Sequence, residues 1–90
     1  MKAEVLSALE GAEQAHHQAF LDQDGHDLEW PLWYADDLLP ELRQLLAAEF
    51  SQSELVYLLL TATYQQQSQA TGQNWADFTA GFLLSRYGLD

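Results

Sequence analysis

The sequence predicts an all-α domain of four helices packed in a mainly antiparallel, bundle-like arrangement. Apolar residues recur three and four positions apart along four segments, the spacing that collects side chains on one helical face. Residues that start or stop helices separate these segments, at Asp24 and Gly25, at Ser51, and between Gly72 and Asn74. The chain has 90 residues, enough for one hydrophobic core, so a single helical domain over residues 1–90 is expected.

The first helix is expected from Lys2 to about Gln23. One face of this segment is apolar, at Val5, Leu9, Ala12 and Phe20. Asp24 and Gly25 then end the helix, because glycine readily adopts the left-handed conformation found after many helices.

The second helix is expected to begin near Pro31, because a first-turn N–H has no helical partner and its loss costs nothing there. Pro40 falls inside the pattern that follows, where it removes a backbone donor and disfavours the helical conformation of Leu39. The sequence therefore predicts a kink, or a split into two short helices, near Pro40. The apolar stripe of this segment is Leu32, Ala35, Leu39, Leu42 and Leu46.

Ser51 and Glu54 form a capping-box pattern at the start of the third helix. The stretch from Leu55 to Tyr64 is apolar on nearly every side, which predicts a central helix. The polar continuation from Gln65 to Gln69 keeps its helical propensity, so this end is expected to leave the core before Gly72 ends the helix.

Asn74 offers an N-cap oxygen to the fourth helix, and Asp77 places a negative charge in its first turn. Trp75, Phe78 and Phe82 are expected to share one face, which extends to Tyr87. The four helices together predict a core made of Leu9, Phe20, Trp33, Leu39, Leu42, Leu46, Leu55, Leu59, Ala62, Phe78 and Phe82.

The composition excludes several classes of function. Three Lys and Arg residues against fourteen Asp and Glu residues give a net charge of -11, which repels nucleic acids and anionic membrane surfaces. The acidic residues are scattered rather than arranged in a run, which argues against mimicry of DNA phosphates. The absence of cysteine excludes disulfides and thiolate sites. No signal-peptide pattern and no apolar run of about 18 residues occurs, so a cytoplasmic protein is expected.

Residues 24–37 are the strongest candidate for a specific site, because aromatic side chains and carboxylates are dense there. Glu13 and His16 have the spacing used twice in di-iron bundles, but this pair occurs once, which argues against a di-metal centre. A single metal ion remains an alternative, and no cofactor is predicted. Its imidazole and carboxylate ligands would come from His16, His17, His26, Asp24 and Asp27.

His16 lies near the centre of the first apolar stripe, so its imidazole is expected to find a hydrogen-bond partner that docks the following loop. The aromatic residues allow two interpretations. Trp33 and Tyr34 could seal the junction of the first, second and fourth helices, with Trp30 partly exposed; or all three could anchor a protein or a flat ligand. In the second case the candidate ligand-binding residues are His16, His26, Asp27, Trp30, Trp33 and Tyr34.

No nucleophile elbow, phosphate-binding glycine loop or cationic clamp is recognisable, which argues against an enzyme. The sequence favours a small protein-interaction module that binds a protein partner or self-associates, as a homodimer formed through exposed apolar residues of the third and fourth helices. A metal or small-ligand domain is the alternative.

Residues His26 to Ala35 read HDLEWPLWYA. This stretch resembles a group of small bacterial helical proteins that carry an HDxxWPxWYA motif after a histidine-bearing helix. The resemblance covers about residues 12–60 and includes the helix start at Ser51, Glu54 and Leu55. It implies a shared architecture but no activity. It also implies a shared constellation of His16 or His17 with Asp27, Trp30, Trp33 and Tyr34.

Overall fold

The computed structural model describes residues 2–19, 30–69 and 72–89, which form four α-helices and no strand. The helices are α1 (Lys2–Ala19), α2 (Trp30–Leu46), α3 (Gln52–Gln69) and α4 (Trp75–Arg86). The prediction of an all-α, four-helix domain is confirmed. The predicted end of the first helix near Gln23 and the predicted core residue Phe20 lie outside the described residues.

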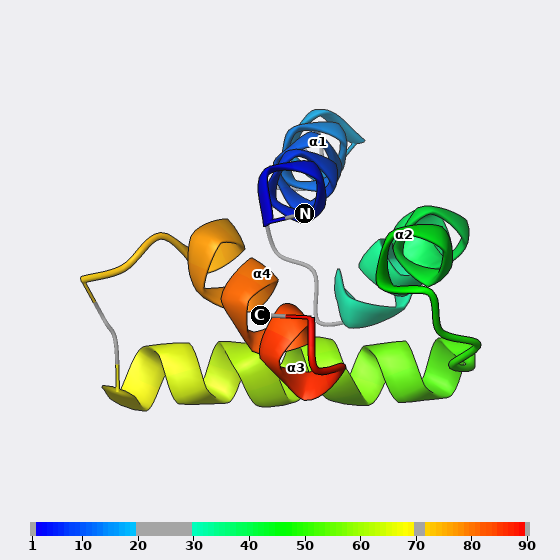
Figure 1. Ribbon diagram of the computed structural model, residues 1–90. Helices are drawn as coiled ribbons and strands as arrows, with labels where there is room; N and C mark the ends of the chain where they lie inside the picture. Colours follow the sequence, from blue (N-terminus) through cyan, green and yellow to red (C-terminus); the bar gives the residue numbers. More distant parts are fainter. Residues whose placement is uncertain (1, 20–29, 70–71, 90) are drawn as a thin grey trace.

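The helices pack as a closed ring, in which α1 contacts α2, α2 contacts α3, α3 contacts α4, and α4 contacts α1. In Figure 1, α3 lies across the view below the other helices, whereas α1 and α2 are seen nearly along their axes. Buried side chains from all four helices meet inside the ring. Of the predicted core, those fully buried are Leu9, Leu42, Leu46, Leu55, Leu59 and Ala62.

The buried stripe of α2 differs from the predicted one at its start. Leu32 is 51% exposed and Leu39 is only partly buried, whereas Leu38 is buried. The first turns of the helix bury Pro31, Tyr34 and Ala35. Continuing this face by steps of three and four residues places Leu38 and Leu42 in the core.

The prediction that Phe78 and Phe82 are buried core residues is wrong, because both are partly exposed; Phe82, like Trp75, is partly buried against the core. The residues that α4 buries are mostly smaller: Ala76, Thr79, Ala80, Leu83 and Leu84. Both faces of this helix are apolar, so periodicity alone does not choose between them. Alanines let α4 pack close to α1 and α3, and the bulky phenyl rings are left at the edge of the contact.

Helix α2 runs through Pro40 as one helix instead of splitting there. The side chain of Pro40 is exposed, and so is that of Asp36, whose carbonyl would accept the missing proline N–H. A backbone carbonyl at the surface can bond to water, which explains why the helix tolerates proline here.

The two predicted capping motifs, at the starts of α3 and α4, are confirmed. At α3, the Ser51 amide donates to Glu54 Oε1 (3.0 Å) and the Glu54 amide donates to Ser51 Oγ (3.1 Å), the reciprocal pair of a capping box. Hydrogen bonding to the Ser51 backbone amide, and then to its side chain, lowers the pKa of the Glu54 carboxyl. At α4, the side chain of Asn74 accepts from the Asp77 amide. Each motif joins residues three positions apart, so the local sequence alone determines it.

Two helices end in the same backbone motif with different residues at the left-handed position. After α2, Ala48 N donates to Arg43 O (3.2 Å) and Ala47 N to Gln44 O (3.3 Å), and Ala47 has a φ of 51°. After α4, Leu89 N donates to Leu84 O (2.8 Å) and Gly88 N to Ser85 O (3.2 Å), and Gly88 has a φ of 69°. Both are Schellman motifs, but only the second uses glycine.

No helix among the described residues is long and apolar enough to cross a bilayer.

The substitution Ala47→Gly should stabilise the protein by about 1 kcal/mol, because glycine adopts positive φ without the steric cost of a Cβ. Urea unfolding followed by circular dichroism measures this change. The matched control is Gly88→Ala, which should destabilise by a similar amount, because no atom lies within 4 Å of the added Cβ and only the backbone conformation opposes it. Loss of stability in Ala47→Gly would contradict the motif assignment.

Candidate functional site

Five rings meet where the carboxyl-terminal part of α1 approaches the amino-terminal ends of α2 and α4. We call this set the aromatic junction. Tyr34 is at its centre and is only 8% exposed, while the other four side chains are partly exposed. The junction consists of His16 from α1, Trp30, Trp33 and Tyr34 from α2, and Trp75 from α4.

The Tyr34 ring touches every other ring of the junction. It stacks on the His16 imidazole with 4.9 Å between centroids and lies tilted by 37° against the Trp75 indole at 5.4 Å. Trp30 and Trp33 meet it edge to face at 5.4 and 5.6 Å. These separations fall within the preferred range for aromatic pairs, each worth about 0.5–1.5 kcal/mol beyond burial.

The junction is connected to α3 through a polar contact. The indole N–H of Trp75 donates to Thr63 Oγ1 at 2.8 Å, and the Thr63 hydroxyl donates in turn to the Leu59 carbonyl at 2.8 Å. A threonine hydroxyl can both accept and donate, so it satisfies the indole while its own hydrogen bonds within the helix. All four helices therefore contribute to this part of the protein.

The surroundings of the junction favour the protonated forms of Tyr34 and Glu13. Burial, and then the nearby Glu13 carboxylate, raise the pKa of the Tyr34 phenol to about 12. Burial and the neighbouring Glu10 raise the pKa of Glu13 as well. Tyr34 therefore remains a neutral phenol at physiological pH and is unsuited to act as a base.

The structure brings together four of the six predicted ligand-binding residues, namely His16, Trp30, Trp33 and Tyr34. Trp30 is partly exposed, as predicted, but so is Trp33, which was expected to be buried in the core. The other two, His26 and Asp27, lie outside the described residues, as does the side chain of His17. Among the described residues, no group of three His, Asp or Glu side chains is arranged to hold a metal ion, so the loop-based metal site of the sequence analysis stays a prediction.

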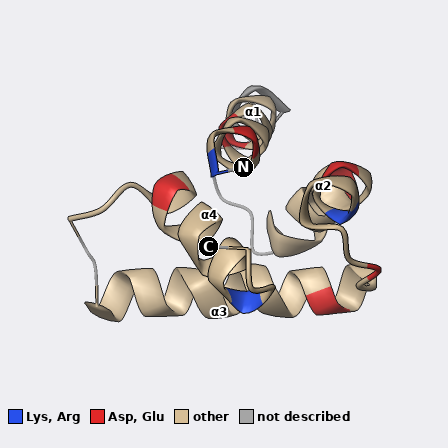
Figure 2. Cartoon of the chain, viewed as in Figure 1, with Lys and Arg blue, Asp and Glu red and all other residues tan. Residues whose placement is uncertain are grey.

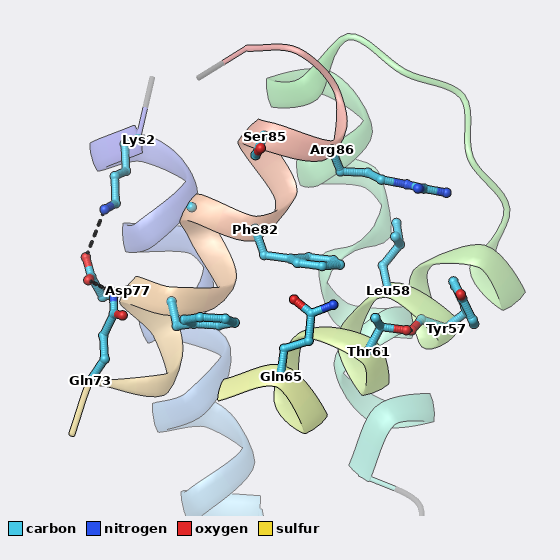
Figure 3. A pocket seen from close by; sticks show the side chains of 12 residues that line it. Lys2, Tyr57, Leu58, Thr61, Gln65, Gln73, Asp77, Phe82, Ser85 and Arg86 are labelled. Carbon is cyan, nitrogen blue, oxygen red and sulfur yellow. Dashed lines mark hydrogen bonds and ion pairs between the residues drawn. The ribbon is translucent and has the colours of Figure 1, made fainter. Parts of the chain in front are cut away.

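A second candidate surface lies on α3 and α4. Three large residues spaced three and four apart point away from the core on α3, and we call them the outer stripe: Tyr57 (62% exposed), Leu60 (47%) and Tyr64 (75%). Beside the stripe, an open groove of about 720 Å³ runs between the two helices. Figure 3 shows Phe82 over the middle of this groove, with Tyr57, Leu58 and Thr61 on the α3 side.

The ends of the groove are polar. At one end, Lys2 Nζ lies 3.2 Å from Asp77 Oδ1, and Gln73 donates to Asp77 Oδ2 at 2.6 Å (Figure 3). These partners lower the pKa of Asp77 and keep it ionised. At the other end lies Arg86, which makes no ion pair or hydrogen bond with another described side chain.

Charge is distributed unevenly over the chain. Helices α3 and α4 contain only Glu54, Asp77 and Arg86 as charged residues, so they carry a net charge of -1 out of the total of -11. Figure 2 accordingly shows α3 almost entirely in tan, the colour of residues other than Lys, Arg, Asp and Glu. The two helices present a nearly neutral surface in a strongly acidic protein.

Comparisons of the chain with protein-family models, with curated proteins and with solved structures gave no match. The resemblance to proteins with the HDxxWPxWYA motif therefore stays a prediction.

Trp75 and Thr63 were not predicted from the sequence as members of the candidate site. Trp75 directly follows the N-cap residue of α4, much as Trp30 stands at the start of α2, and this shared position at a helix start was a usable signal. The individual residues of the outer stripe were also missed. The apolar character of the third helix on nearly every side was the signal for them, because such a helix exposes some apolar residues unless it is enclosed.

The substitution Thr63→Val should destabilise the protein by about 1–3 kcal/mol, because it leaves the partly buried Trp75 indole without its acceptor. Thermal unfolding measures the change. Thr61→Val is the matched control, since the Thr61 hydroxyl also donates to a carbonyl four residues earlier, that of Tyr57, but accepts no indole. Equal effects of the two substitutions would show that the indole contact contributes nothing.

The raised pKa of Tyr34 predicts a loss of stability in alkali. The ordinary pKa is 10.0 and the folded value is about 12, so folding favours the neutral phenol. This contribution is complete below about pH 10 and is lost as the pH rises through about 12. Urea unfolding of Tyr34→Phe across this range should show a smaller loss than that of the unmodified protein. Parallel curves for the two proteins would contradict the prediction.

Proposed function

We propose that this chain is a non-enzymatic protein-interaction module that binds through the outer stripe of α3 and the adjoining groove. The observation that supports this function best is the exposure of Tyr57, Leu60 and Tyr64 on a helix whose only charged residue is Glu54. Aromatic residues dominate the binding energy of protein interfaces, and the central part of such interfaces is poor in charge.

The shape of the groove also supports a protein partner over a small molecule. Pockets for small ligands enclose most of the ligand surface, whereas this groove is open to solvent and shares Tyr57 with the outer stripe. A partner that covers both the stripe and the groove must itself be extended over two helices.

A metal or small-ligand domain built on the aromatic junction is the second proposal, favoured by the convergence of His16, Trp30, Trp33 and Tyr34. It ranks lower because rings of the junction contact one another directly, as they do in a packed core. Native mass spectrometry tests it: the expected result is one metal or ligand per chain that is lost in His16→Ala. We place the protein in the cytoplasm as part of the same proposal.

The interaction module is tested by photo-crosslinking in the cells that produce the protein. A benzophenone amino acid replaces Tyr64, the most exposed residue of the outer stripe. The same group at Gln44, an exposed position on α2, is the control. Light should yield a covalent adduct with a protein from position 64 and not from position 44.

The mass of the adduct distinguishes self-association, which doubles the chain mass, from binding to another protein. The absence of any adduct from position 64, or equal adducts from both positions, would overturn the proposal.

A further inference from the structure

The charged residues at the two ends of the groove are opposite in sign and related by the geometry of α4. Asp77 and Arg86 are nine positions apart on this helix. At 3.6 residues per turn and 1.5 Å per residue, they are separated by about 14 Å along the axis and by half a turn around it. They therefore flank the exposed face of α4 at opposite ends and on opposite sides.

Residues between these charges form the centre of the face. Phe78, Gly81 and Phe82 are partly exposed and line the groove, and Ser85 is exposed. A two-fold axis that lies in the plane of the interface over Gly81 and Phe82, perpendicular to the line from Asp77 to Arg86, places Asp77 of each copy opposite Arg86 of the other. The face is thus complementary to itself in charge, which is what an isologous interface requires.

We propose that a second copy of this chain occupies the groove, in a two-fold arrangement that sets Arg86 of each copy beside Asp77 of the other. This inference rests on the proposed function, to which it adds the partner and its orientation. The two cross pairs form at opposite ends of the interface, and Phe82 of each copy lies near the axis.

The charge distribution favours a second copy over a partner of another kind. A basic partner would be attracted to α1, α2 and the acidic remainder of the chain, where nearly all the negative charge resides. The nearly neutral surface of α3 and α4 instead suits an equally neutral surface. Two copies that meet there keep their acidic parts apart, and each supplies a carboxylate to Arg86, which pairs with none among the described residues.

Gly81 permits close approach at the centre of this interface. An added Cβ at Gly81 would meet no atom within 4 Å, so the space above it is open in the single chain. A helix packed across Gly81 would come closer than it could across a residue with a side chain. The same openness makes Gly81 a position where a substitution affects the interface without disturbing the fold.

Charge reversal tests the orientation. Arg86→Asp and Asp77→Arg each turn both cross pairs into repulsive ones, so each should raise the dissociation constant of the dimer at least about tenfold. An equal mixture of the two variants should restore the dimer, because both cross pairs are then attractive in the mixed species. Sedimentation velocity on purified, untagged chains from micromolar to millimolar concentration measures the association, and circular dichroism verifies the fold of each variant.

Gly81→Glu should also abolish the dimer. Its matched control is Gly11→Glu on α1, another glycine with open space around it, which should leave the dimer unchanged. This pair tests the interface even if Asp77→Arg fails to fold through loss of its contact with Lys2.

An unmodified chain that stays monomeric at all concentrations would overturn the inference, as would a dimer that is indifferent to Gly81→Glu or is not restored in the mixture. Such failures are distinguishable from failure of the interaction module, because a crosslink from position 64 to a different protein would leave that proposal standing.

Discussion

The contacts of the Tyr34 ring with His16 and Trp75 hold this fold together at one end. They join α2 to α1 and to α4, and the Trp75 hydrogen bond to Thr63 extends the connection to α3. A ring of helices with few contacts across its centre depends on such joints. Elsewhere the Phe50 and Tyr87 rings, 5.4 Å apart, join the segment before α3 to the end of α4.

Local signals in the sequence predicted the capped helix starts correctly. They did not predict the buried face of α4, which depends on long-range packing. The capping box at Ser51 and Glu54 and the N-cap at Asn74 involve residues within one turn, so no other part of the chain changes them. The buried face of α4 was mispredicted because hydrophobicity ranks Phe78 above Ala76. The close approach of α1 and α3 instead selects the smaller side chain.

In the candidate site, too, the residues close together in sequence were predicted and the distant one was not. Trp30, Trp33 and Tyr34 were identified from their clustering, but Trp75 joins them from about forty residues away, and no spacing rule connects positions so far apart. The nearly neutral surface of α3 and α4 was not predicted, for a different reason. Total charge and scattered acidic residues describe the chain as a whole, whereas a binding surface depends on which helices lack charge, as α3 does apart from Glu54.

The closed ring also constrains how the chain can fold during synthesis. Helix α1 leaves the ribosome before α4, yet α4 is one of its two packing partners and carries both Asp77, which pairs with Lys2, and Trp75 of the aromatic junction. The core therefore cannot close until α4 has left the exit tunnel. Until then the faces of α1 and α3 that α4 covers stay exposed, so the core is completed only after α4 has been synthesised.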